Sequence, residues 1–227
     1  MNKIIYLVFI SSLFIHSCTK ELIVDPNFPE WTVYNSSNSS LPGTASHIAI
    51  DHSGNKWIST KAGLVKFDGK NWTIYNRSNS GLPSINISFL ASDKNNIWIG
   101  TQDSGLVKFN GTQWKVYNTS NSGIASNYIS CIAVDSLLNI WVGNSDLSHN
   151  NNGRAGISKF DGNTWTIYDV IFSGLASDEI FTISIDKKNI KWITAHLPSS
   201  HLGETAFLAS FDDISWKTFT GSTIGFA

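Results

Sequence analysis

Two polar segments of the sequence carry most of the side chains that could bind a ligand. They are "NSDLSHNNNGRAG", residues 144 to 156, and "HLPSSHLGETA", residues 196 to 206. Carboxylates, amides, imidazoles and a guanidinium are planar hydrogen-bonding groups, which suit ligands rich in hydroxyl groups. The candidate binding residues in these segments are Asp146, His149, Asn151, Arg154, His196, His201 and Glu204.

The same segments offer little for catalysis. His196 and His201 lie five residues apart with Glu204 nearby, a spacing that matches no specific zinc pattern, so we predict no metal. The sequence also lacks a nucleophile elbow, a phosphate-binding loop and a setting for a cysteine nucleophile. We therefore predict no catalytic residue and no cofactor.

The elements that must position these segments are internal repeats. All nine Trp residues fall into two interleaved series. One series opens phrases such as "WTIYN", and the other lies in phrases such as "IWIGT". Before each Trp of the second series, an apolar run ends in an Asp, which is expected to cap a turn. After each of these Trp residues, a further apolar run such as "GLVKF" ends in a Phe. The repeated residues are Trp31, Trp72, Trp114, Trp165 and Trp216; Trp57, Trp98, Trp141 and Trp192; Asp51, Asp93, Asp135 and Asp186; and Phe67, Phe109, Phe160 and Phe211.

Each repeat of about 41 residues contains four short β-prone runs bounded by Gly, Asn, Asp or Ser. Pairs such as Asp68-Gly69 and Asn110-Gly111 suit tight hairpins between the third and fourth runs, whereas Asp212-Asp213 is a poorer turn. Four antiparallel strands per repeat, here named a, b, c and d from the axis outward, predict an all-β fold of β-propeller blades.

The repeat resembles the two-component regulator propeller repeat of Bacteroidota proteins. The shared pattern is Gly-Leu-Pro-Ser and an apolar strand, then Asp-x-x-x-Asn-x-Trp-Ile-Gly-Thr, then Gly-Leu-Val-Lys-Phe, then Trp, over residues 31 to 227. The fourth repeat departs from it, because Phe207 replaces the Gly and Ser210 replaces the Lys. The resemblance implies a periplasmic sensor propeller of about seven blades that often responds to glycans. The sequence contains no kinase or DNA-binding segment, so the signalling role is not carried over.

The strand order predicts a lone d strand at Trp31, four complete blades, and an end just after the d strand at Trp216. The predicted repeats cover residues 31–71, 72–113, 114–164 and 165–215, with a remnant at 216–227. We expect an incomplete, truncated propeller, because no a, b and c strands are present to join the first d strand. The alternative is a closed four-bladed ring with a spare N-terminal strand.

Loop length locates the candidate site. The distance from the second-series Trp to the Phe is 10, 11, 19 and 19 residues in the four repeats, and other spacings are nearly constant. The extra residues lie in the b-to-c loops, which share one face of a propeller with the d-to-a loops. That face, which we call the rim, adds Asn127, Tyr128, Asp178 and Glu179 to the candidate site. The alternative is that these loops are drifting surface insertions.

The first eighteen residues form a separate element. A positive start, a twelve-residue apolar core and Ile15-His16-Ser17-Cys18 resemble the signal peptide and lipobox of bacterial lipoproteins. We expect lipidation of Cys18, a tether over residues 19–30, and an outer-membrane lipoprotein facing the periplasm or the cell surface. An ordinary secretion signal is the alternative.

Charge and composition limit the function classes. Lys and Arg total 16 against 17 Asp and Glu without a run of one sign, so we expect no nucleic-acid partner and no membrane contact beyond the lipid anchor. The sequence predicts a non-catalytic cell-envelope binding or sensor-like module, with a glycan or an envelope protein as partner. The alternatives are a protein-interaction scaffold and an enzyme similar to the streptogramin lyases.

Overall fold

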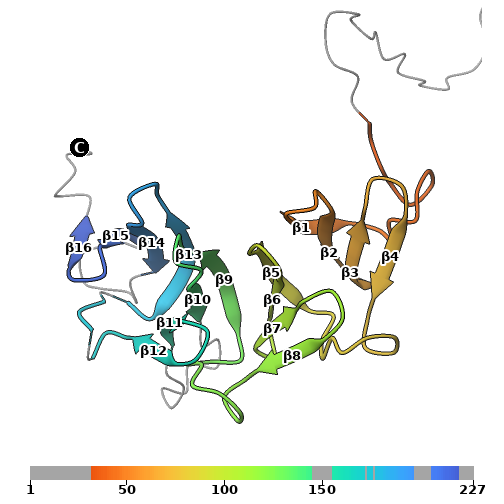
Figure 1. Cartoon of the computed structure of the whole chain (residues 1–227). Helices are drawn as coiled ribbons and strands as arrows, with labels where there is room; N and C mark the ends of the chain where they lie inside the picture. The colour runs from red at the N-terminus through yellow and green to blue at the C-terminus, as the bar shows by residue number, and fades with distance from the viewer. Residues whose placement is uncertain (1–31, 145–154, 172, 176, 197–205, 220–227) are drawn as a thin grey trace, which may run out of the picture. The chain divides into compact units, whose positions relative to one another are not determined.

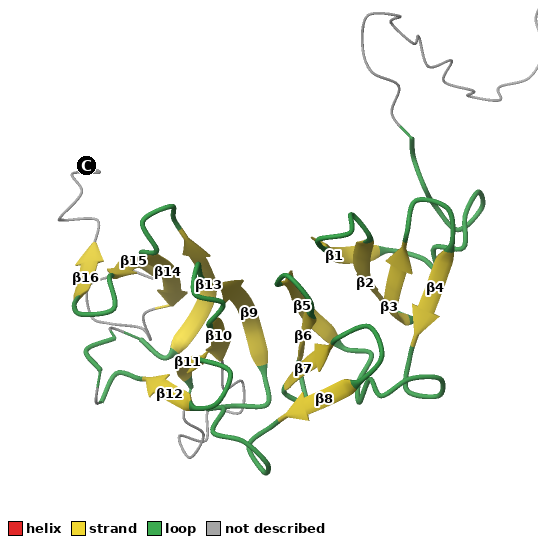
Figure 2. Ribbon diagram, viewed as in Figure 1, coloured by secondary structure: helices red, strands yellow, loops and turns green. Residues whose placement is uncertain are grey.

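The computed structural model describes residues 32–144, 155–171, 173–175, 177–196 and 206–219. Over these residues the chain forms sixteen strands in four separate antiparallel sheets, and it contains no helix (Figures 1 and 2). The described part thus includes no helix that could cross a membrane. Residues from Tyr34 onward belong to one compact unit, which contains all four sheets.

Each sheet is built from four strands that are consecutive in the sequence. The first holds β1 (Ala45–Ile50), β2 (Lys56–Thr60), β3 (Gly63–Phe67) and β4 (Trp72–Tyr75). The second holds β5 (Ile87–Ser92), β6 (Ile97–Thr101), β7 (Leu106–Phe109) and β8 (Trp114–Tyr117). The third holds β9 (Ile129–Val134), β10 (Ile140–Asn144), β11 (Gly156–Phe160) and β12 (Trp165–Tyr168). The fourth holds β13 (Glu179–Ile185), β14 (Lys191–His196), β15 (Ala206–Phe211) and β16 (Trp216–Phe219).

This order confirms the predicted propeller blades with strands a, b, c and d. The last strand of each sheet begins with the Trp that starts the next predicted repeat. The blades are therefore shifted by one strand relative to the predicted repeats. The a strands of successive blades, β1, β5, β9 and β13, contact one another along the series. The four blades form an open series and not a closed ring over the described residues.

Aromatic rings fix the register of the c and d strands. Phe67 lies opposite Trp72 in the β3–β4 ladder, and their rings stack with centroids 4.2 Å apart. The same pair recurs at 4.1 Å, 4.8 Å and 4.4 Å in the other blades. Each hairpin therefore places a large aromatic pair at its outer edge, which accounts for the constant spacing between Phe and Trp.

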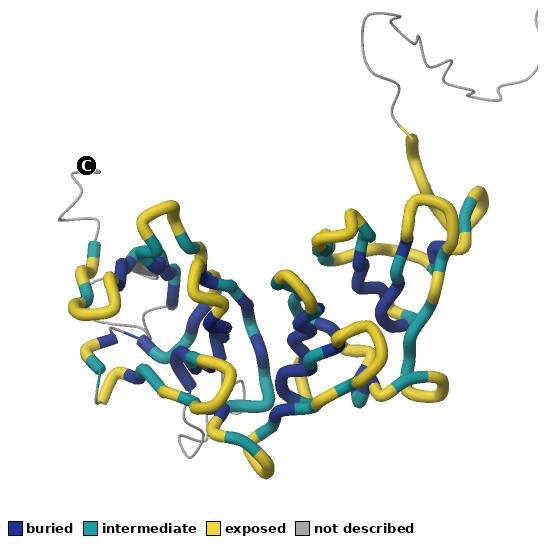
Figure 3. The backbone as a smooth tube through the Cα atoms, in the orientation of Figure 1, coloured by how far each residue is buried: buried dark blue, intermediate teal, exposed yellow. Residues whose placement is uncertain are grey.

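A tyrosine on each of the first three d strands, β4, β8 and β12, joins one blade to the next. The Tyr75 ring stacks on Trp57 of its own blade at 5.9 Å and contacts Phe109 and Trp114 of the second blade, both at 5.6 Å. Tyr117 and Tyr168 repeat this arrangement at the next two interfaces. The core of the molecule consequently lies between blades, as the buried segments of Figure 3 show.

The lone d strand predicted at Trp31 begins outside the described residues, and no strand is assigned to residues 32–35. Tyr34 nevertheless makes the contacts that the tyrosine of a d strand makes with the next blade. The Tyr34 ring lies 5.2 Å from Phe67 and 5.4 Å from Trp72, as Tyr75 does on the second blade.

The repeated Asp residues cap the a-to-b turns, as predicted. Asp135 accepts hydrogen bonds at Oδ1 from the backbone N–H of Leu137 and of Asn139, at 2.9 and 2.8 Å. Its Oδ2 accepts from Asn139 Nδ2 at 2.8 Å and from Trp141 Nε1 at 3.0 Å. One carboxylate thus holds the turn and orients the indole on the following b strand.

The c-to-d turns need a left-handed residue. Gly69, Gly111 and Gly162 have φ angles of 96°, 96° and 101°. In the fourth blade Asp213 takes this position at φ 73°, while Asp212 Oδ1 accepts hydrogen bonds from the following backbone N–H groups. The turn expected to be poor is formed, because Asp tolerates the left-handed region and also caps.

Each a strand carries a β-bulge opposite the C-terminal residues of its b strand, a feature that the repeats did not predict. Two of the facing b-strand residues are glycines. A Cβ added to Gly100 would lie 2.7 Å from Ile129 Cγ2, and one added to Gly143 would lie 2.9 Å from Ile180 Cγ2. These glycines let the next blade approach closely, which brings the a strands together.

Candidate ligand-binding rim

The predicted rim is held together by hydrogen bonds between the two kinds of loop. The backbone N–H of Gly105, in the b-to-c turn of the second blade, donates to the Asn127 carbonyl at 2.9 Å. The N–H of Gly156 donates to the Asp178 carbonyl at 2.9 Å in the same way. These bonds confirm that the b-to-c and d-to-a loops share one face.

Glycine is required at this junction. Gly105 and Gly156 have φ angles of 85° and 107°, and a Cβ on either would overlap the carbonyl oxygen of the Tyr that ends the neighbouring d strand. A side chain there would push the two loops apart. The close backbone approach therefore sets the spacing of the rim.

Asn127 and Asp178, both candidate residues, occupy equivalent places and brace their own loops. Asn127 Oδ1 accepts a hydrogen bond from the Thr119 N–H at 2.9 Å, and Asp178 Oδ1 accepts one from the Val170 N–H at 2.9 Å. Burial raises the pKa of the Asp178 carboxyl, and the nearby Asp169 carboxylate adds to the increase, although the Val170 bond opposes it. These two side chains therefore hold the conformation of their loops without a ligand.

Tyr128 and Glu179 follow these braces directly and are half-buried. Their N–H groups donate to Ser126 Oγ and Ser177 Oγ, at 3.0 and 3.1 Å. Glu179 begins β13 and pairs with His196, the last residue of β14, across the ladder. The fold thus brings Glu179 and the backbone of His196 together at the start of the second long segment.

Asn144 is a rim residue that the sequence analysis missed. In the first two blades Thr60 and Thr101 stand at this place, and each hydroxyl donates to a glycine carbonyl that closes a short b-to-c turn. Asn144 is fully buried; its Oδ1 accepts from Ser158 Oγ at 2.6 Å, and its Nδ2 donates to the Ser126 carbonyl at 3.3 Å. The signal was present in the change from "IWIGT" to "IWVGN", at the residue where the long loop begins.

The remaining candidates lie outside the described residues. They are Asp146, His149, Asn151, Arg154, His201, Glu204 and, at the N-terminus, Cys18. Within the described ranges no group of three or more His, Cys, Asp or Glu side chains is arranged to hold a metal ion.

Three grooves are lined by described residues, and none of the candidate site residues lines them. One of about 460 Å³ lies beside β7 and β8, and one of about 670 Å³ lies between the d strands of the second and third blades. A third, of about 260 Å³, lies between the first and second blades beside their a-to-b turns, on the side of the blades opposite the rim loops.

Comparison with known proteins gives structural matches alone, because no protein-family model and no curated protein matches the chain. The extracellular domain of the hybrid two-component system BT3049 from B. thetaiotaomicron is similar, with a TM-score of 0.59, 22% identity, and coverage of 78% of this chain and 24% of that one. PorZ, a surface component of the type-IX secretion system of Porphyromonas gingivalis, matches with a TM-score of 0.56, 16% identity, and coverage of 76% and 26%. Virginiamycin B lyase from Staphylococcus aureus matches with a TM-score of 0.56, 13% identity, and coverage of 78% and 55%.

This chain spans about a quarter of the length of the first two proteins and about half of the lyase. Identities this low carry the fold and no activity. The first match agrees with the resemblance read from the repeats, since it is the extracellular domain of a Bacteroides two-component protein. The chain therefore has the β-propeller fold that such extracellular domains share.

Proposed function

We propose that this protein is a non-catalytic, extracytoplasmic binding module that recognises a hydroxyl-rich glycan at the rim of its third and fourth blades. The observation that carries the proposal is the bonding of b-to-c loops to d-to-a loops, through Gly105 with Asn127 and Gly156 with Asp178. It supports a site in which side chains from four loops face one ligand. The extracellular setting of the B. thetaiotaomicron match supports the same placement.

The rim is suited to glycan binding because hydrogen bonds hold the ends of its loops and the sequences of its two long loops are polar. Buried Asn144 and the two braces hold the loop ends, so the longer segments begin from fixed points. Tyr128 adds a ring beside the amides and carboxylates. Hydrogen bonds in an open site contribute about 0.5–1.5 kcal/mol each, so we expect roughly micromolar to millimolar affinity.

Loop shortening tests the proposal. Replacing residues 145–154 and 197–205 with connections as short as the "STKAG" of the first blade should leave the circular dichroism spectrum unchanged and abolish binding on a glycan array. A matched control, Asn76→Ala in a d-to-a loop of the first blade, should bind as the wild type does. Retained binding by the shortened protein would place the site elsewhere, and binding to envelope proteins without glycan binding would favour the scaffold alternative.

We further propose that Cys18 carries a lipid that anchors the protein in the outer membrane. The motif Ile15-His16-Ser17-Cys18 supports this, and the thirteen residues from Cys18 to Trp31 would reach at most roughly 45 Å when extended. Labelled palmitate should be incorporated by the wild type and lost in Cys18→Ser. Equal labelling of both would contradict the anchor.

A further inference from the structure

The groove between the first and second blades lies beside the a-to-b and c-to-d turns, away from the rim. Its volume is about 260 Å³. Its lining includes the buried rings of Trp57 and Phe109 together with Lys66, Lys94 and His52. The one lining carboxylate, Asp51, is occupied by hydrogen bonds from its own turn and from Trp57 Nε1. The groove therefore combines two lysines, one of them over the Trp57 ring, with a carboxylate whose oxygens are already hydrogen-bonded.

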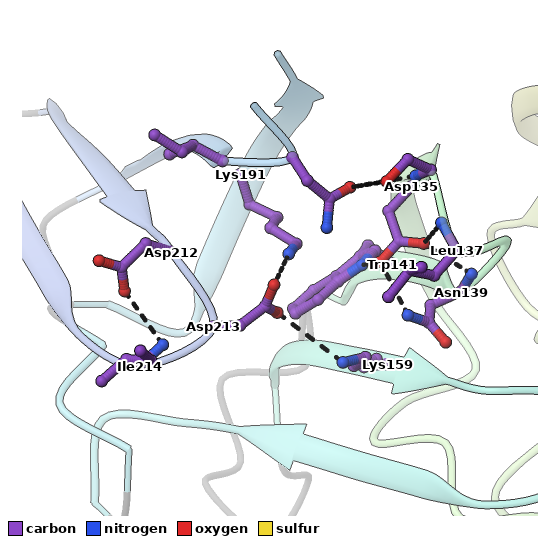
Figure 4. Close-up of polar contacts among 12 residues, drawn as sticks. Asp135, Leu137, Asn139, Trp141, Lys159, Lys191, Asp212, Asp213 and Ile214 are labelled. Carbon is purple, nitrogen blue, oxygen red and sulfur yellow. Dashed lines mark hydrogen bonds and ion pairs between the residues drawn. The ribbon is translucent and has the colours of Figure 1, made fainter. Parts of the chain in front are cut away.

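The same position between the third and fourth blades contains a carboxylate of the protein itself. Figure 4 shows Asp213 reaching from the c-to-d turn to lie between Lys191 and Lys159, beside the Trp141 ring. The Lys159 and Lys191 Nζ atoms lie 4.9 and 4.7 Å from the centre of that ring. The carboxylate is needed here, because the Lys191 side chain is fully buried and a buried ammonium requires a partner.

The two interfaces correspond in the strand ladders, except that Ile97 of the second blade stands where Lys191 stands in the fourth. Lys66 lies opposite Trp57 as Lys159 lies opposite Trp141, and Lys66 Nζ is 5.5 Å from the centre of the Trp57 ring. Gly111 takes the turn position of Asp213, and a Cβ added to Gly111 would meet nothing within 4 Å. The space that a carboxylate fills at one interface is therefore open at the other.

Lys66 has no carboxylate within ion-pair distance among the described residues, where both ion pairs involve Asp213. Asp68, at the exposed end of the same strand, interacts with Lys66 only through its charge, and its carboxylate is bound by the backbone of its turn. An ammonium held over an indole at the edge of a groove attracts an anion without loss of an existing partner.

We propose that this groove binds the carboxylate of a small ligand, which takes the place that Asp213 takes at the third interface. The ligand carboxylate pairs with Lys66, and the exposed Lys94 adds a second charge from the a-to-b turn of the second blade. Such a carboxylate belongs either to a uronic acid or to an amino acid. This site is distinct from the rim, and its failure would leave the proposed glycan site standing.

Nuclear magnetic resonance titration of the ¹⁵N-labelled protein tests the site. D-Glucuronate and N-acetylglycine supply the carboxylate from the two sources, and D-glucose is the neutral control. We expect the amides of Lys66 and Gly111 to shift with at least one carboxylate and not with glucose. Equal shifts with glucose, or none with either carboxylate, would overturn the proposal.

Two variants test which groups of the groove bind the carboxylate. Lys66→Ala removes the cation, and Gly111→Asp supplies an internal carboxylate at a turn position where Asp213 is accepted; each should weaken binding about tenfold or more. Lys108→Ala is the matched control, since Lys108 lies 5.4 Å from the centre of the Trp98 ring at the next interface. It should bind as the wild type does, and loss of binding in this variant alone would overturn the assignment.

Discussion

Replacement of Asp135 by Asn should strongly destabilise the third blade. Asp135 is 4% exposed, its carboxylate accepts four hydrogen bonds, two at each oxygen, and its partner Trp141 is fully buried. An asparagine at this place has a single acceptor oxygen. Whichever way its amide is turned, an NH₂ group faces two donors, so two hydrogen bonds are lost.

The size of the effect follows from that loss. Hydrogen bonds to a charged acceptor contribute about 1.5–3 kcal/mol each, and water cannot enter to satisfy the Trp141 indole. The free energy of unfolding should therefore fall by about 3 kcal/mol or more. With a urea dependence of about 2 kcal/mol per molar, the unfolding midpoint should fall by about 1.5 M.

Asp186→Asn is the matched control. Asp186 caps the equivalent turn and accepts from Trp192 Nε1 at 3.2 Å, but it is exposed, so water replaces the lost acceptor. Urea unfolding followed by tryptophan fluorescence should show a much smaller shift for this variant. Equal shifts in both variants, or no shift in Asp135→Asn, would refute the argument that burial of the capped indole sets the cost.

Further predictions concern the core and the turns. Gly143→Ala should lower the melting temperature more than Gly111→Ala, because a Cβ at Gly143 would lie 2.8 Å from Ser130 Oγ and 2.9 Å from Ile180 Cγ2, whereas at Gly111 the Cβ meets nothing within 4 Å and the cost comes from the positive φ angle alone. Cys131 should react with a thiol reagent only after denaturation, since burial raises the pKa of its thiol to about 11; rapid reaction in the native protein would contradict the packed third interface. Burial opposes ionisation of Asp93, but hydrogen bonds from the turn and from the Trp98 indole hold the pKa of its carboxyl below the ordinary value. This stabilisation is present above the unfolded pKa of about 3.9 and is lost as pH falls through the lower folded value, so the melting temperature should drop below about pH 4, and less so in Asp93→Asn.

The blade plan could be predicted because its main signals are local. Trp72 follows Phe67 by five residues, and hairpin geometry leaves one register in which both rings share a face. The Asp-to-Trp spacing likewise specifies a capped turn followed by a buried b strand. Constant spacing in four repeats then predicts four similar sheets.

Features set by the neighbouring blade could not be predicted in this way. The ion pairs of Asp213 depend on Lys191 and Lys159, and the latter belongs to a different blade. The requirement for Gly143 comes from Ile180 of the next blade. At the rim, the residue types of Asn127 and Asp178 were compatible with ligand contact, but the backbone N–H groups that occupy them become visible only once the loop is folded.

The tyrosine arrangement has a consequence for how the molecule unfolds. Tyr75, Tyr117 and Tyr168 each stack on the Trp of their own blade and also contact the Phe and Trp of the next. A blade cannot loosen its d strand without exposing rings on the following blade, so opening of one unit raises the free energy of its neighbour. Amide hydrogen exchange should then report foldons larger than a single blade, with coupling that decays along the series one interface at a time.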